Sequence, residues 1–221
     1  MKREIMITGD GSKTIHMPDL NEQYHSKHGA LQEARHVFIK TGLEYYLEDV
    51  DTQVEELRIL EYGFGTGLNA LLTALYKHKT SIQYTATEAF PINTKEILAM
   101  DYGNLLDADS LFQKLHSVSW ESPTVIHEQF QLIKKQIKFE AISFESAFDV
   151  IYFDAFGPRT QPELWTLEIF EAAFQALSKN GVLVTYCAAG QVRRNLQAAG
   201  FEVERLPGPP GKREMLRAIK M

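Results

Sequence analysis

The sequence has 221 residues, of which 44% are hydrophobic and 24% are charged, a composition ordinary for a globular domain that can bury one sizeable core. Its longest apolar stretches are strand-sized. The N-terminal residues "MKREIMITGDGSKTIH" have neither the apolar region of a secretion signal nor a membrane-spanning length. We therefore expect one main domain, in the cytoplasm and without membrane contact. The single cysteine, Cys187, excludes an internal disulfide and a cysteine-based zinc cluster, and its apolar surroundings indicate a buried thiol.

The formal net charge of −6 is unevenly distributed along the chain. Residues 151–221 contain 9 Lys+Arg and 7 Asp+Glu, so the acidic excess lies in the residues before them. Charges act locally, because the Debye length is about 8 Å at physiological salt. The C-terminal part is therefore the expected face for a polyanion, with the pairs Arg193–Arg194 and Lys212–Arg213 as candidates. Solvated surface charge is the alternative interpretation.

Residues 1–54 differ from the rest of the chain. They open with a strand-and-turn pattern, "REIMITGDGSKTIHM", and continue with a polar segment that contains His and Tyr, "NEQYHSKHGALQEARHVFIKTGL". We interpret residues 1–54 as an N-terminal extension packed on the sheet of a domain that spans residues 55–221.

From residue 55 onward, strand-like and helix-like segments alternate, which is typical of an α/β fold with a parallel sheet covered by helices. Strands are predicted at 57–63, 82–90, 123–130, 147–156 and 182–187, and helices at 68–78, 162–181 and 191–200. The final residues, "FEVERLPGPPGKREMLRAIKM", predict two strands around a Pro/Gly-rich loop. That loop is either a mobile lid or a hairpin connection.

A glycine-rich turn, "EYGFGTGLN", joins the first of these strands to its helix. Such a turn lets backbone N–H groups approach a ligand closely. Leu68 stands where a dinucleotide fingerprint needs Gly or Ala, and no Gly-Lys-Ser/Thr follows to make a phosphate loop. Gly63, Gly65 and Gly67 therefore favour a nucleoside ligand without a pyrophosphate, of which S-adenosylmethionine is the commonest. A purely structural turn is the alternative.

Acidic residues follow two later strands. Glu88 ends the next strand after the glycine turn, where a carboxylate can accept hydrogen bonds from ribose hydroxyls; a solvated strand end is the alternative. Asp154 ends the 147–156 strand, at the edge where open α/β sheets place their ligand crevice. Phe156, Pro158 and Trp165 surround it, and aromatic faces suit a flat base or a sulfonium, although Trp165 also suits a helix core. The seven histidines have no metal-ligand spacing, so no metal site is predicted.

Four blocks, in this order, resemble the methyltransferase domain of the MnmC family, the tRNA 5-(aminomethyl)-2-thiouridine methyltransferases: "EYGFGTGLNALL", "DAFGPRTQPELWTLEIF", "AAGQVRRNLQAAGF" and "GKREMLRAI". The segment "NEQYHSKHGALQEARHVFI" is similar to that domain's opening. The resemblance implies a Rossmann-like class I methyltransferase fold with S-adenosylmethionine as methyl donor. It also implies N-methylation of 5-aminomethyl(-2-thio)uridine at the tRNA wobble position.

The resemblance bears on partners too. Some relatives are fused to a flavin-dependent oxidoreductase that trims a carboxymethyl group, and this sequence lacks it. We therefore expect methylation only, with a separate protein supplying the aminomethyl precursor.

Roles for single residues follow from the same resemblance. It implies that the methionine and ribose end of the cofactor is lined by Glu61, Gly63, Gly65 and Gly67, and that Glu88 holds the ribose. Asp154 would lie beside the reacting amine. In the N-terminal segment, Tyr24 and Glu33 would close over the cofactor. Where the family has an Asp near the adenine, this sequence reads "HEQFQL", and Glu128 or Gln129 is the expected substitute. For a flipped wobble base we expect stacking on Phe156 beside Pro158 and phosphate contacts from Arg193, Arg194, Lys212 and Arg213.

Two other functions stay open from the sequence. A small-amine or polyamine methyl- or aminopropyltransferase of the same fold would also place an Asp after the fourth strand. A non-catalytic nucleotide-binding subunit is the other alternative, and the combination of the glycine turn with Asp154 argues against it.

Overall fold

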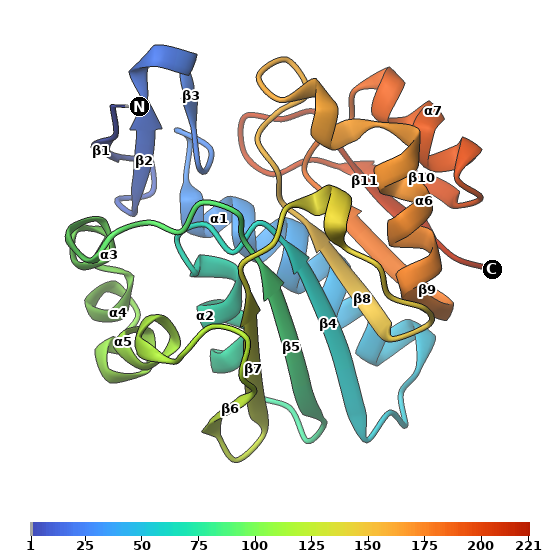
Figure 1. Cartoon of the computed structure of the whole chain (residues 1–221), viewed down its shortest axis with the longest axis horizontal. Coiled ribbons are helices and arrows are strands. Elements are labelled where there is room, and N and C mark those ends of the chain that lie inside the picture. Colours follow the sequence, from blue (N-terminus) through green and yellow to red (C-terminus); the bar gives the residue numbers. More distant parts are fainter. Residues whose placement is uncertain (1) are drawn as a thin grey trace.

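The computed structural model describes residues 2–221, and a mixed eight-stranded sheet forms its centre (Figure 1). The strands lie in the order β10-β11-β9-β8-β4-β5-β7-β6. Their bounds are β4 Glu56–Tyr62, β5 Ser81–Thr87, β6 Thr124–His127, β7 Phe130–Lys135, β8 Phe148–Phe153, β9 Leu177–Thr185, β10 Glu202–Pro207 and β11 Glu214–Ile219. The five strands from β9 to β7 run parallel, while β6, β10 and β11 are antiparallel to their neighbours. The predicted α/β class is confirmed.

Helices cover both faces of the sheet, because alternate side chains of each central strand point to opposite sides. Leu57 and Ile59 of β4 face one apolar cluster, and Leu60 and Tyr62 face the other. The helices after β4 are α2 Leu68–Leu75, α3 Thr94–Met100, α4 Tyr102–Leu105, α5 Asp109–Ser117, η4 Phe139–Ala141, η5 Pro162–Trp165, α6 Leu167–Ala176 and α7 Gly190–Ala198. No helix within residues 2–221 is long and apolar enough to span a bilayer.

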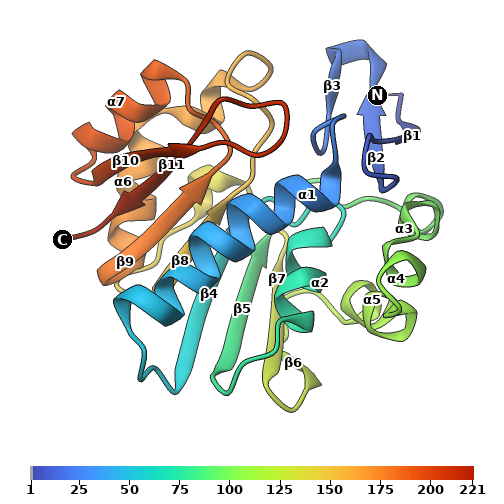
Figure 2. The ribbon, with the colours of Figure 1, turned by 180° about the vertical axis from the view of Figure 1, so that it is seen from behind.

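Residues 2–54 contain two structures. Strands β1 (Glu4–Ile7), β2 (Lys13–Met17) and β3 (Glu22–Gln23), with the short helix η1 (Pro18–Leu20), make a small antiparallel sheet. A long helical run, α1 (Ala30–Ala34) continued by the wider turns of η2 (Arg35–Glu44) and η3 (Tyr46–Val50), then crosses the back of the main sheet (Figure 2). Its Phe38 ring packs on Tyr152 of β8, with ring centres 5.2 Å apart.

Two predicted elements are wrong in their bounds. The strand predicted at 123–130 is the antiparallel β6 plus the turn into β7, and the parallel strand beside β5 is β7. The helix predicted at 162–181 is η5 and α6, and the chain passes into β9 at Leu177 without an intervening loop. The predicted C-terminal strands are β10 and β11, and the loop between them is a hairpin connection.

The order of the strands fixes where a ligand can lie. After β4 the chain adds β5 and β7 on one side, and it later adds β8 and β9 on the other. The connections on the two sides of this switch point diverge, which opens a crevice outside the carboxyl ends of β4 and β8. Gly63 and Asp154 are the residues that directly follow these two strands.

Candidate active site

A cavity of about 560 Å³ opens at this switch point, a volume typical of small-molecule sites. Six of the residues singled out in the sequence line it: Tyr24, Gly63, Gly65, Glu88, Asp154 and Phe156. They come from the N-terminal segment and from the loops after β4, β5 and β8. Residues far apart in the sequence therefore meet at one edge of the sheet.

The glycine turn is held to the neighbouring strands by its backbone. The N–H groups of Gly63 and Phe64 both donate to the carbonyl oxygen of Thr87, at 3.0 and 2.9 Å. Gly63 has a φ of +93°, and a Cβ atom there would lie 2.7 Å from the carbonyl oxygen of Asp154. Only glycine combines this left-handed backbone with so close an approach to β8.

Glu88 joins the turn to the end of β5. Its Oε2 accepts a hydrogen bond from the N–H of Gly65 at 3.0 Å, and its Oε1 accepts one from the N–H of Phe90 at 2.8 Å. Each carboxylate oxygen can accept further bonds, so this side chain is both anchored and able to hold hydroxyl groups of a ligand.

The amide of Asn69 connects two carboxyl groups on the cavity floor. Its Nδ2 donates to Oε1 of Glu61 at 3.0 Å and to Oδ2 of Asp154 at 2.8 Å. Glu61 is fully buried, and burial together with the charge of Asp154 raises its pKa well above the usual carboxyl range. Burial is also the main reason that the pKa of Asp154 rises to about 7, with a smaller contribution from Glu33. The site thus holds a carboxyl group that titrates near neutrality.

Two histidines, the buried His25 and the half-buried His116, hold the middle of the turn. The Nε2 atom of His25 lies 3.3 Å from Oγ1 of Thr66, and the Nε2 atom of His116 lies 3.2 Å from the carbonyl oxygen of Thr66. Burial lowers the pKa of both imidazoles to about 4, so both are neutral at pH 7. Because His25 belongs to the N-terminal segment, that segment helps to shape the turn.

The N-terminal segment also crosses the cavity mouth. The ring of Tyr24 meets that of Phe156 edge to face, with centres 4.9 Å apart. Oγ1 of Thr160 donates to Oε2 of Glu22 at 3.0 Å. These contacts connect β3 to the loop after β8 and form a roof over the space between them.

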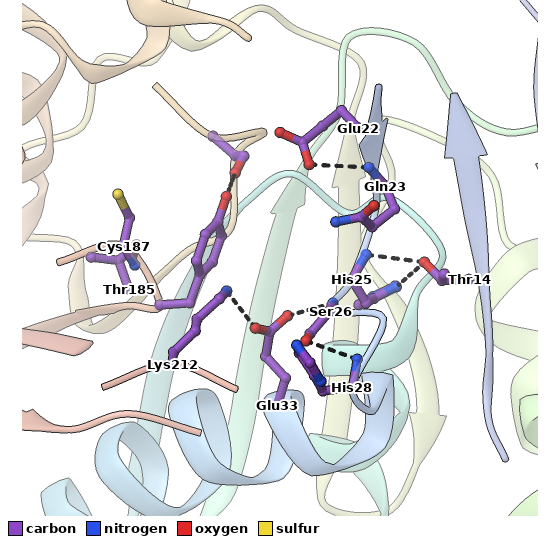
Figure 3. Close-up of polar contacts among 12 residues, drawn as sticks. Thr14, Glu22, Gln23, His25, Ser26, His28, Glu33, Thr185, Cys187 and Lys212 are labelled. Atoms are coloured by element: carbon purple, nitrogen blue, oxygen red, sulfur yellow. Dashed lines mark hydrogen bonds and ion pairs between the residues drawn. The ribbon is translucent and has the colours of Figure 1, made fainter. Parts of the chain in front are cut away.

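Tyr186 forms one wall of the cavity, and an ion pair packs against the side of its ring that faces away from the cavity. The Lys212 ammonium lies 2.5 Å from Oε2 of Glu33 (Figure 3). It also lies 3.6 Å from the centre of the Tyr186 ring. The other carboxylate oxygen of Glu33 accepts from the N–H of Ser26 (Figure 3). The Tyr186 hydroxyl donates to the carbonyl oxygen of Ala155, next to Asp154. The loop before β11 is therefore tied to the N-terminal helix and to the cavity wall.

Known proteins with this architecture place the chain in a family. Residues 112–221 match the family model described as S-adenosyl-L-methionine-dependent methyltransferase. The tRNA 5-methylaminomethyl-2-thiouridine biosynthesis bifunctional protein MnmC of Leptospira interrogans is 30% identical over 231 residues, which cover 96% of this chain and 34% of that protein. The crystal structure of MNMC2 from Aquifex aeolicus superposes with a TM-score of 0.74 at 27% identity, over 98% of this chain and 70% of that one. The chain belongs to the MnmC methyltransferase-domain family.

This chain spans about a third of the length of the curated relatives it matches. Proteins with much lower sequence identity share the fold. Spermidine synthase from Thermotoga maritima has a TM-score of 0.56 at 14% identity, over all of this chain and 72% of that one. The predicted Rossmann-like methyltransferase fold is confirmed, and S-adenosylmethionine is the cofactor of the family.

The cavity of this MnmC-family chain fits that cofactor. Gly63 and Gly65 leave the turn without side chains where a ligand would approach, and Glu88 offers carboxylate oxygens to ribose hydroxyls. The buried Oδ1 atom of Asn69 has no partner within residues 2–221, as expected where a ligand completes the hydrogen bonding.

Several expected contacts need correction. Glu61 reaches the cavity only through Asn69, and Gly67 packs on the His116 and Phe64 rings. Glu33 does not close over the cofactor position, because it lies in the ion pair behind Tyr186. For the same reason, the Lys212 ammonium is committed to Glu33 instead of being free for phosphate.

The expected adenine contact is also wrong. Glu128 and Gln129 lie in the β6–β7 turn, beside the first residues of β5 and so at the sheet edge opposite the cavity (Figure 1). The residues that follow β7 and line the cavity are Lys138, Phe139 and Glu140.

Phe156, expected to stack on the flipped base, lines the cavity, whereas the residues expected to contact RNA phosphates do not. Arg194 and Arg213 are exposed, on α7 and in the β10–β11 loop, whereas Arg193 is half-buried. Pro158 follows Phe156 in the loop after β8 but is not among the described residues that line the cavity. Trp165 is buried in the core, as its alternative interpretation predicted.

Sequence reasoning missed other residues of the cavity: Arg3, Asn69, Phe90, Gln161, Glu163 and Tyr186. Two of them carried a usable signal. Asn69 lies inside the quoted glycine block, at the start of α2, and Tyr186 directly follows β9, where the same rule that found Asp154 applies. Arg3 carried no usable signal in the sequence, because its position at the cavity depends on how the N-terminal sheet packs on the domain.

Proposed function

We propose that this chain methylates the amine of 5-aminomethyl(-2-thio)uridine at the wobble position of tRNA, giving the 5-methylaminomethyl form. Membership of the MnmC family supports the choice of substrate, since the matched relative is named for the biosynthesis of 5-methylaminomethyl-2-thiouridine in tRNA. The observation that carries the proposal is the Asp154 carboxyl group, which faces a cavity shaped by the glycine turn and titrates near pH 7.

The chemical task is to present an amine lone pair in line with a methyl group. The bound cofactor supplies that methyl group on a sulfonium, and transfer forms an N–C bond as the S–C bond breaks. An aliphatic amine with a pKa near 10.4 is protonated at pH 7, and freeing its lone pair costs up to about 4–5 kcal/mol. In our proposal ionised Asp154 accepts a hydrogen bond from the amine, orients it and takes up the proton that it releases.

Other parts of the chain have roles in the proposal. Glu88 holds the ribose, Tyr24 covers the cofactor from the N-terminal segment, and Phe156 stacks on the flipped base beside Pro158. The exposed Arg194 and Arg213, with Arg193, contact phosphates. We treat residues 1–54 as an extension that completes the domain of residues 55–221, because His25 and Tyr24 both reach the site.

The proposal extends to cellular context. The reaction takes place in the cytoplasm, on tRNA. In the proposal, a separate protein supplies the aminomethyl precursor.

Methyl transfer from labelled S-adenosylmethionine to tRNA from cells lacking this protein tests the proposal directly. Nucleoside mass spectrometry should find aminomethyluridine converted into a product heavier by one CH₂ unit. Asp154→Asn should strongly reduce the rate at which the product forms, while Glu171→Gln, which changes an exposed acid on α6, should leave that rate intact. No product from tRNA shown to carry the precursor, together with turnover of a free polyamine, would assign the site to small amines instead.

A further inference from the structure

One buried oxygen on the cavity floor, Oδ1 of Asn69, makes no hydrogen bond within residues 2–221. Asn69 is only 3% exposed, yet it lines the cavity from the start of α2. Buried polar atoms in proteins are almost always paired, so this unpaired acceptor calls for a ligand that donates a hydrogen bond.

The neighbours of Asn69 fix the orientation of its amide. Its nitrogen lies 3.0 Å from Oε1 of Glu61 and 2.8 Å from Oδ2 of Asp154, and the ionised Asp154 of the proposed function can only accept. The reversed amide would bring its oxygen against both carboxyl groups. The two N–H hydrogens are therefore used by the two acids, and Oδ1 is the atom left for a ligand.

We propose that Asn69 is a positioning residue for methyl transfer. Its amide nitrogen holds the Glu61 and Asp154 carboxyl groups in one fixed arrangement, and its Oδ1 accepts a hydrogen bond from the substrate amine beside Asp154. The inference rests on the proposed function, because Asp154 is the group that Asn69 positions. An amine with several N–H donors matches this set of acceptors, whereas a hydroxyl substrate would leave one of them unpaired.

The chemistry of the pair predicts the effect of removing the amide. Hydrogen bonds from Asn69 favour the charged carboxylates, and burial opposes them. The other titratable groups that face the pair are Glu88 at the end of β5, the phenols of Tyr84 and Tyr186, and the Glu33–Lys212 ion pair behind the wall. Without Asn69, Glu61 and Asp154 should both hold their protons to higher pH.

Kinetics give the first test. Asn69→Ala should lower kcat about 10- to 100-fold at pH 7, the loss expected for one hydrogen bond to a charged group. It should also move the acidic limb of the pH–rate profile upward and leave the affinity for S-adenosylmethionine nearly unchanged. Thr73→Val is the matched control, because Thr73 is buried one turn along the same helix and its hydroxyl bonds the Asn69 carbonyl instead of the acids.

Thermal unfolding gives a second test that needs no substrate. The two acids lose a donor that matters most when they are ionised, so the drop in Tm caused by Asn69→Ala should grow between about pH 5 and about pH 8. The drop caused by Thr73→Val should be the same at both values.

The two tests separate the inference from the proposed function. If the wild type fails to methylate tRNA while the drop in Tm caused by Asn69→Ala still grows with pH, the proposed substrate is wrong. The inference that Asn69 holds the Glu61 and Asp154 carboxyl groups is then still supported. If Asn69→Ala matches Thr73→Val in kcat, in pH profile and in Tm, the inference is overturned. A loss of cofactor affinity with unchanged kcat would also overturn it, since Asn69 would then serve the cofactor.

Discussion

Glu33 and Lys212, 179 residues apart in the sequence, form an ion pair that braces one wall of the cavity. The Glu33 side chain is 7% exposed and that of Lys212 is 30% exposed. The ammonium lies at the same time against the face of Tyr186, which lines the cavity. The N-terminal helix and the loop before β11 therefore fix each other and the wall between them.

Lys212→Met should destabilise the protein by about 1–3 kcal/mol, because it leaves the Glu33 carboxylate buried without its partner; partial exposure of Lys212 keeps the loss below that of a fully buried pair. Urea denaturation measures the change. Arg205→Met is the control, since Arg205 pairs with Glu214 near the surface at 3.8 Å and should lose less than about 1 kcal/mol. Adding Glu33→Gln to Lys212→Met should recover part of the loss. Equal stability of the two single variants would contradict a structural role for the ion pair.

Asp154→Asn should lower kcat about 10²- to 10⁴-fold, the range for a positioned acid–base group, with a much smaller change in cofactor affinity. The amide keeps the shape of the carboxyl group but cannot take a proton from the amine. Single-turnover kinetics and calorimetric titration with S-adenosylmethionine measure the two effects. Equal losses in both would show that Asp154 serves binding and not the transfer step.

The pH dependence of the reaction should show an acidic limb near pH 7. The pKa of Asp154 is raised to about 7, so the ionised form that accepts from the amine accumulates only as the pH rises through that value. Asp154→Asn should remove this limb. An acidic limb that survives unchanged in the variant would assign it to another group, such as the substrate amine.

The same raised pKa affects stability with the opposite trend. A carboxyl group whose folded-state pKa lies above its unfolded value stabilises the fold in acid, and that contribution is lost as the pH rises through about 7. Tm should therefore decline between about pH 5 and about pH 8, and Asp154→Asn should make the decline shallower. Identical slopes for wild type and variant would contradict the assignment.

Gly63→Ala should destabilise the protein and weaken cofactor binding, because the new Cβ would lie 2.7 Å from the Asp154 carbonyl oxygen at a φ of +93°. Gly11→Ala provides a matched control. Its φ is +82°, but a Cβ there meets no described atom within 4 Å, so it should cost only the backbone term of about 1 kcal/mol. Denaturation and cofactor titration of both variants separate the cost of backbone strain at a positive φ from the cost of the contact between the new Cβ and Asp154. A Gly63→Ala protein as stable as Gly11→Ala would show that β8 can move away.

The strand-end rule accounts for most of what the sequence could predict. Glu88, Asp154 and the glycine turn each follow a strand, and parallel strands end at one edge of the sheet. The order of the elements was therefore enough to predict that these residues meet in one cavity. The bond from Asn69 to Asp154 joins residues 85 positions apart, and no local pattern encodes such a contact.

Lys134 explains the misplaced adenine contact. It is 1% exposed on β7, where its ammonium donates to the His116 carbonyl oxygen and lies 4.9 Å from the centre of the Trp120 ring. A lysine within "FQLIKK" favours a surface segment over a central strand, so the local pattern of β7 does not display its burial. Tertiary partners, which the sequence does not display, overrode the usual preference of lysine for solvent.

The position of β11 has a consequence for how the protein is made. This strand lies between β9 and β10, yet it follows both in the chain. During synthesis β9 therefore remains an open edge until residues 214–219 have left the ribosome, and the loop that carries Lys212 arrives only just before them. A nascent chain that pauses before this point exposes an apolar strand edge, which is a template for aggregation and a target for chaperones.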